Sequence, residues 1–129
     1  MNQEILIRLS MLEQQTKQLE EHLRLVEQNI LEMQTLSHSL DEIDGNKNDV
    51  ILSQLANGIF MKSKLEEKKF FVDVGSRIIV KKTASEVKEV VGEQMKKLMN
   101  AKNEIYEQLG LLGKEMEKLV QQARKDGEK

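Results

Sequence analysis

The sequence "QLANGIFMKSKLEEKKFFVDVGSRIIVKKT", Gln54 to Thr83, decides the fold because it does not share the pattern of the chain on either side. An Asn-Gly pair divides its first half, and this pair suits a type I′ hairpin turn with positive φ at both central residues. A second hairpin is indicated by "FFVDV" and "RIIVKK" around Gly75-Ser76. We therefore expect two β-hairpins within residues 50–82, with the turn residues Asn57, Gly58 and Gly75.

On both sides of this segment, apolar residues recur with alternating gaps of four and three, which is the spacing of a coiled-coil seam. The first series is Ile5, Leu9, Leu12, Thr16, Leu19, Leu23, Val26, Ile30, Met33, Ser37 and Leu40. The second is Val91, Met95, Leu98, Lys102, Ile105, Leu109, Leu112, Met116, Leu119 and Ala123. We expect helices over residues 1–44 and 84–126. Because the connector must return the chain, they should pair antiparallel, with Ile5 near Ala123.

The ends of these helices also carry signals. Thr83 with Glu86 three residues later predicts a capping box at the start of the second helix, and Gly45 suits the end of the first. We expect the C-terminal residues from Arg124 onward to fray. Lys102 interrupts the second seam, either as a register-setting polar layer or as a snorkelling side chain, and snorkelling is favoured.

Composition limits the function classes. The chain has 129 residues, of which 33% are charged and 3% aromatic, and it contains no Cys. Its 20 basic and 22 acidic residues are interleaved, so neither nucleic acid nor a membrane is an expected partner. His22 and His38 stand apart from any cluster of ligands, so we expect no metal, no cofactor and no enzyme activity. Neither a signal peptide nor an apolar run of membrane-spanning length is recognised, and we expect a cytoplasmic protein.

The strand segment predicts assembly. Two isolated hairpins are marginally stable in water and expose strand edges. We expect neither hairpin to be covered by its own chain, because the helical arms run away from that end. The apolar residues expected to mediate oligomerisation are Leu52, Leu55, Ile59, Phe60, Met61, Leu65, Phe71, Val72, Val74, Ile78, Ile79 and Val80.

A second apolar set lies near the chain ends, off the seam. These residues are Leu6, Ile7, Met11, Leu111 and Val120. Exposed apolar patches commonly mark interaction sites, so we expect binding there, together with the adjoining seam residues Ile5, Leu9, Leu12, Met116 and Leu119. The alternative is that the terminal heptads slip by one residue and bury Ile7.

The chain resembles prefoldin, specifically an archaeal-like alpha-type subunit. The resemblance is carried by "LANGIFMKSKL" and by "FFVDVGSRIIVKKTASEV", which look like the hairpin pair of that family running into its second helix. Beta-type subunits have one hairpin, and two are expected here. The chain departs from the family in lacking a Pro before the first turn, where it reads "VILSQLA".

The resemblance implies a mostly helical subunit of a hexamer with two alpha-type and four beta-type subunits. The hairpins of the subunits would form an intersubunit β-barrel platform. It further implies an ATP-independent holdase that binds unfolded proteins at its coiled-coil tips and passes them to a group II chaperonin. The alternative is a coiled-coil scaffold or adaptor with one specific folded partner.

Overall fold

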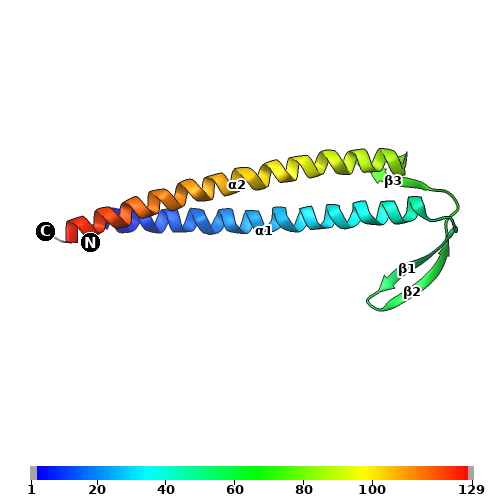
Figure 1. Ribbon diagram of the computed structural model, residues 1–129, viewed down its shortest axis with the longest axis horizontal. Coiled ribbons are helices and arrows are strands. Elements are labelled where there is room, and N and C mark those ends of the chain that lie inside the picture. The colour runs from blue at the N-terminus through cyan, green and yellow to red at the C-terminus, as the bar shows by residue number, and fades with distance from the viewer. Residues whose placement is uncertain (1–2, 128–129) are drawn as a thin grey trace. The chain divides into compact units, whose positions relative to one another are not determined.

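The computed structural model describes residues 3–127, which form two long helices joined by two hairpins (Figure 1). The elements are α1 (Gln3–Gly45), β1 (Val50–Ala56), β2 (Ile59–Lys64), β3 (Lys69–Asp73), β4 (Ile79–Thr83) and α2 (Ala84–Gly127). The predicted order of helix, two hairpins and helix is confirmed. Residues 124–127, where we expected fraying, belong to α2. Residues 1–2 of the expected first helix and residues 128–129 of the expected frayed tail lie outside the described residues.

The chain divides into two compact units. Unit 1 comprises residues 1–31 and 95–129, and unit 2 comprises residues 32–94. Unit 1 is an antiparallel helix pair. Near the chain ends its buried core contains Ile5, Leu12, Leu119 and Ala123. A second buried group contains Val26, Ile30 and Ile105. The antiparallel seam predicted from the apolar spacing is therefore confirmed in unit 1, where each predicted seam residue is buried or partly buried.

Polar residues on the unit 1 seam are satisfied locally. The Thr16 hydroxyl donates to the Leu12 carbonyl at 2.8 Å, one turn earlier. The ammonium of Lys102 reaches sideways to within 3.9 Å of a Glu27 carboxylate oxygen and lies 6.0 Å from the Tyr106 ring centroid. This geometry is the snorkelling predicted for Lys102. The Tyr106 hydroxyl donates to the same carboxylate at 3.1 Å, and this hydrogen bond raises the pKa of Tyr106.

Strands β1 and β2 of unit 2 pair antiparallel around Asn57-Gly58. The type I′ geometry expected of this turn is wrong, because Gly58 has a φ of +79° whereas Asn57 is not among the described non-glycine residues with positive φ. The register instead shifts between Gln54 and Ala56, which leaves an extra residue on β1. Such a bulge increases the local twist, so the strands meet without a mirror-image turn.

The turn between β3 and β4 lies one residue later than predicted. Ser76 and Arg77 have φ values of 51° and 62°, and the Ile78 amide donates to the Gly75 carbonyl at 2.9 Å. Ser76 and Arg77 are therefore the central residues of a turn with positive φ at both positions, as in type I′. The cause is Asp73, whose carboxylate accepts from the Gly75 amide at 2.9 Å and extends the loop before the turn begins.

The β3–β4 hairpin packs against the helices of unit 2. Leu40, Val87 and Val91 form the buried core, and Phe70 and Val72 of β3 pack against it. The expectation that neither hairpin is covered by its own chain is therefore wrong for one face of β3–β4. Strand alternation explains the result, because residues 70 and 72 share the face of the hairpin that lies on the helices. Figure 1 shows β3 running beside the first turns of α2.

The junction between α1 and the hairpins is fixed by polar contacts. The Lys68 ammonium, in the connector between the hairpins, donates to the carbonyls of Asp44 and Asn46 at 3.0 and 2.7 Å. A cation at this position compensates the negative end of the helix dipole, and α1 has no basic residue in its own last turn. Lys88 of α2 lies 2.7 Å from Asp41, and this hydrogen bond raises the pKa of Lys88.

The predicted capping box at the start of α2 is confirmed. The Glu86 amide donates to the Thr83 hydroxyl at 3.2 Å, and the Thr83 amide donates to the Glu86 carboxylate at 3.2 Å. The Thr83 hydroxyl also donates to this carboxylate at 3.0 Å. These hydrogen bonds hold the pKa of Glu86 below its ordinary value, and the one from the Thr83 backbone amide has the largest effect. Strand β4 thus passes directly into a capped helix.

Candidate functional site

The apolar residues near the chain ends are exposed on unit 1. We call these five residues the tip surface: Leu6, Ile7, Met11, Leu111 and Val120. Ile7 is 59% exposed and Leu111 is 67% exposed. The alternative in which a register slip buries Ile7 is therefore wrong. Covering an exposed apolar side chain removes it from water and favours binding, so the tip surface is a candidate binding surface.

The seam residues that we predicted beside the tip surface lie inside the helix pair. Ile5, Leu12 and Leu119 are buried, and Leu9 and Met116 are partly buried against them. These five side chains hold α1 and α2 together at the same level as the tip surface. In the closed pair they offer a partner less surface than the exposed side chains of the tip surface do.

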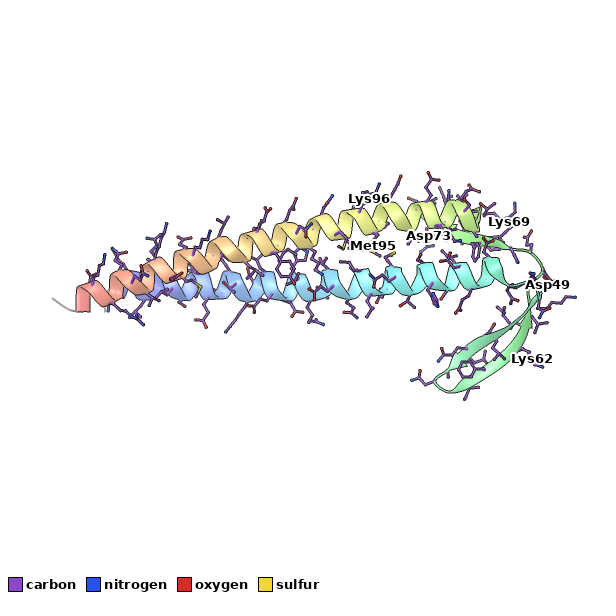
Figure 2. All side chains as sticks on the ribbon, viewed as in Figure 1. Asp49, Lys62, Lys69, Asp73, Met95 and Lys96 are labelled. Atoms are coloured by element: carbon purple, nitrogen blue, oxygen red, sulfur yellow. The ribbon has the colours of Figure 1, made fainter. Side chains whose placement is uncertain are left out.

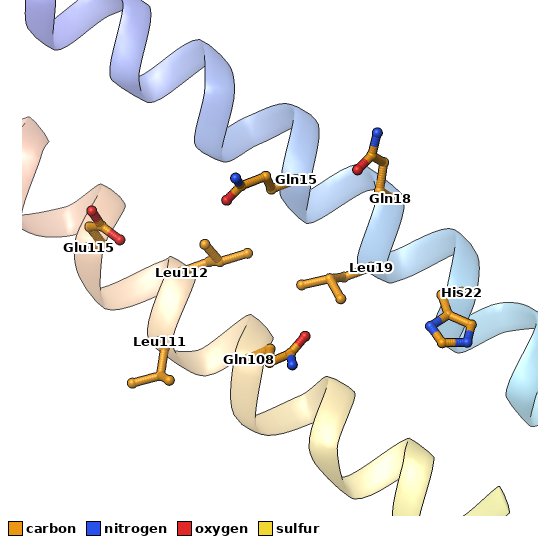
Figure 3. Close-up of a pocket in the computed structure, with 8 residues that line it drawn as sticks. All are labelled: Gln15, Gln18, Leu19, His22, Gln108, Leu111, Leu112 and Glu115. Carbon is orange, nitrogen blue, oxygen red and sulfur yellow. The ribbon is translucent and has the colours of Figure 1, made fainter.

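Leu111 borders two hollows in unit 1. Figure 3 shows the first, in which Leu19 of α1 and Leu112 of α2 point toward each other and the amides of Gln15 and Gln108 lie alongside. This hollow has a volume of about 520 Å³. The second, of about 510 Å³, is lined by Arg8, Leu111, Lys114, Glu115, Lys118 and Leu119. Leu111 and Glu115 line both, so the two hollows adjoin on one side of the helix pair.

The strands present a second apolar surface, on unit 2. Ten of the residues predicted to mediate oligomerisation are exposed, namely Leu52, Leu55, Ile59, Phe60, Met61, Phe71, Val74, Ile78, Ile79 and Val80. Leu65 is only partly exposed, and Val72 packs on the helix core. Each described sheet has two strands, so every strand has one unpaired edge. Lys62 on β2, and Lys69 and Asp73 at the two ends of β3, are labelled in Figure 2.

The comparisons with known proteins agree with this architecture. The family description "Prefoldin subunit" matches residues 12–129. The chain belongs to the prefoldin family. A search of curated proteins found no match. Among solved structures, the chain is similar to a cryo-EM structure of filamentous PFD from Methanocaldococcus jannaschii, with a TM-score of 0.71 and 15% identity. That match covers 94% of this chain and 99% of the other, and at this identity it shows the prefoldin fold alone.

Neither histidine of this prefoldin chain joins a metal-binding group. Within residues 3–127, no three His, Cys, Asp or Glu side chains are placed to hold a metal ion. His22 lies at the edge of the first hollow, and His38 lies 3.2 Å from Glu42 one helical turn away. Neither α1 nor α2, over its described length, has a segment sufficiently apolar to cross a membrane.

The sequence reasoning missed the polar lining of the hollows and the inward side of β3. Gln15 and Gln108 flank the seam from opposite helices, and the antiparallel register would have identified them as neighbours. Phe70 was left out of the apolar strand residues, although its spacing of two from Val72 places both on one face. The position of Lys68 at the end of α1 has no sequence signal, because its two partners lie 24 and 22 residues away.

Proposed function

We propose that this chain is an alpha-type prefoldin subunit that acts as an ATP-independent, non-enzymatic holdase. The tip surface would bind apolar segments of unfolded proteins, which would then pass to a group II chaperonin. The observation that carries this proposal is the exposure of the five apolar tip side chains beside a seam that stays buried at the same level. Exposed apolar surface of this kind commonly marks an interaction site.

The alpha-type assignment is supported by the two hairpins. Their unpaired edges and exposed apolar side chains fit assembly with beta-type subunits, in the hexamer of two alpha-type and four beta-type chains that the resemblance implies. In this proposal the hairpins contribute to an intersubunit β-barrel. Several weak tips on one platform would raise avidity for a client without a tight individual site. The proposal assigns the assembly to the cytoplasm.

A direct test uses a tip variant and a matched control in an aggregation assay. The tip variant replaces Ile7 and Met11 with Ser. The control replaces Leu25 and Leu31 with Ser, since both are exposed apolar residues of α1 outside the tip surface. We expect the tip variant, assembled with beta-type subunits, to lose most of its suppression of the aggregation of a denatured client. The control should suppress like the wild type, with unchanged helical content in both.

Three results would count against the proposal. Equal suppression by the tip variant and the wild type would remove the tip surface from client binding. A failure of the wild-type assembly to suppress aggregation, together with a tight stoichiometric complex with one folded protein, would favour a scaffold or adaptor instead. Measurement of the solution mass with and without a beta-type subunit tests the assembly separately, and a stable monomer in both conditions would contradict it.

A further inference from the structure

The two hollows share Leu111 and Glu115 in their lining, so we treat them as one recess of unit 1. We call this recess the side groove, and the residues that matter for its chemistry are Arg8, Gln15, Gln108, Leu111, Lys114 and Lys118. Of the tip surface, Leu111 lines the side groove, whereas Leu6, Ile7, Met11 and Val120 line neither hollow. The side groove therefore overlaps the tip surface at one residue, and its lining includes apolar, neutral polar and charged side chains.

One half of the side groove has an excess of positive charge. Three cations, Arg8, Lys114 and Lys118, line it with a single carboxylate, Glu115. Arg8 lies 3.4 Å from that carboxylate, and neither lysine makes an ion pair with any described residue. The whole chain has a net charge of −2, so the local excess is opposite in sign to the overall balance. This half complements a negatively charged group.

The other half offers apolar contact and free amides. Leu19, Leu111 and Leu112 supply the apolar lining, as Figure 3 shows. The side-chain amides of Gln15 and Gln108 make no hydrogen bond with residues 3–127. Each amide carries donors and an acceptor, which match the N–H and C=O groups of a peptide. An extended segment of an unfolded protein presents those backbone groups unpaired, together with apolar side chains.

We propose that the side groove binds an extended segment of a non-native polypeptide in which an acidic residue lies next to apolar residues. This inference rests on the proposed holdase function and adds a sequence preference to it. The apolar side chains enter between Leu19, Leu111 and Leu112. The glutamine amides bond the backbone of the segment, and its carboxylate lies at Lys114 and Lys118. The preference is modest, because exposed ion pairs contribute little each.

The test uses three fluorescent, unstructured peptides that share the same apolar residues and differ only in the residues next to them, which are Asp, Ser or Lys. Fluorescence anisotropy with the full assembled chain gives the three affinities. We expect the Asp peptide to bind about fivefold more tightly than the Ser peptide and the Lys peptide to bind most weakly. The differences should shrink as salt is added.

Charge reversal locates the preference. Lys114→Glu with Lys118→Glu should invert the order of the Asp and Lys peptides. The matched control, Lys96→Glu with Lys97→Glu, changes two exposed lysines of α2 outside the groove and should keep the wild-type order. Leu111→Ser should weaken the binding of all three peptides by a similar factor without changing the order of their affinities. Circular dichroism checks that each variant remains helical.

The outcomes separate the two proposals. Equal binding of the three peptides, or an unchanged order in the Lys114/Lys118 variant, would overturn the side-groove inference while leaving the holdase function in place. If no peptide binds and the assembly also fails to suppress aggregation, the holdase function itself is overturned.

Discussion

The two hairpins of unit 2 have similar apolar content and different surroundings. In β3–β4, Phe70 and Val72 pack on Leu40, Val87 and Val91, while Phe71 on the opposite face is 71% exposed. The β1–β2 hairpin contributes no residue to a buried cluster of the described chain, and its Leu52 is 67% exposed. The difference teaches that one hairpin is stabilised partly by packing on its own helices, whereas the other contributes no side chain to a buried core of the described chain.

The largest expected effect comes from truncating one phenylalanine in each hairpin. Phe70→Ala removes a partly buried ring from the helix core and should lower the free energy of unfolding of the isolated chain by about 2 kcal/mol. Phe60→Ala removes a ring that is 57% exposed and should change it by less than about 0.5 kcal/mol. Urea denaturation of the two variants, at a concentration where the chain is unassembled, measures both values.

The two variants should have effects of the opposite order on assembly. Phe60→Ala should weaken association with beta-type subunits more than Phe70→Ala does, after correction for the lower stability of the latter. Equal losses of stability in the two isolated variants would show that β1–β2 is packed within its own chain, and the contrast between the hairpins would be wrong.

A smaller effect is expected at the junction that both hairpins share. Lys68→Met keeps most of the side-chain length and removes the charge-assisted bonds to the carbonyls of Asp44, in α1, and Asn46, just beyond it, so it should destabilise the chain by about 1 kcal/mol. The control is Lys47→Met, an exposed lysine of the same junction for which no bond within residues 3–127 is found. Hydrogen exchange at the end of α1 should accelerate only in the Lys68 variant. Equal exchange in both variants would show that Lys68 does not cap the helix.

The smallest expected effect is the pH dependence of the capping box between β4 and α2. The native pKa of Glu86 is lowered by the Thr83 hydrogen bonds, so its charged form contributes stability that is fully present above the ordinary Glu value of 4.5. This contribution is lost as the pH falls through the lowered native pKa. The difference in Tm between the wild type and Glu86→Gln should be constant near neutral pH and should shrink in acid.

A Tm difference between the wild type and Glu86→Gln that is the same at pH 7 and pH 3 would contradict the capping role of the Glu86 charge.

The sequence predicted the features that depend on local spacing. The seams from Ile5 to Leu40 and from Val91 to Ala123, the capping box and the two hairpins all follow from residue periods and from Asn-Gly or Thr-x-x-Glu pairs. The type I′ geometry at Asn57-Gly58 and the exact position of the second turn were wrong, because they depend on a register shift in β1 and on Asp73, which are not part of the turn dipeptides. The sequence also placed the exposed tip surface, because residues off the seam of a helix pair have nothing to cover them.

What the sequence did not predict depends on contacts between distant parts of the chain. The packing of β3 on the helices requires the hairpin to fold back against them. The spacing of apolar residues does not indicate in which direction a hairpin folds. The side groove requires Gln15, Gln108 and Leu111 to meet from two helices, and these residues have no common motif. Both features follow only once the antiparallel register and the direction of the hairpins are known.

The most direct test of the central claim is hydrogen exchange of the two hairpins before and after assembly with a beta-type prefoldin subunit. The central claim is that β1–β2 lacks cover within its own chain while β3–β4 has it on one face. We predict that amides of β3–β4 are protected in the unassembled chain and that amides of β1–β2 become protected only on assembly. Strong protection of β1–β2 in the unassembled chain, unchanged by the partner, would contradict the account.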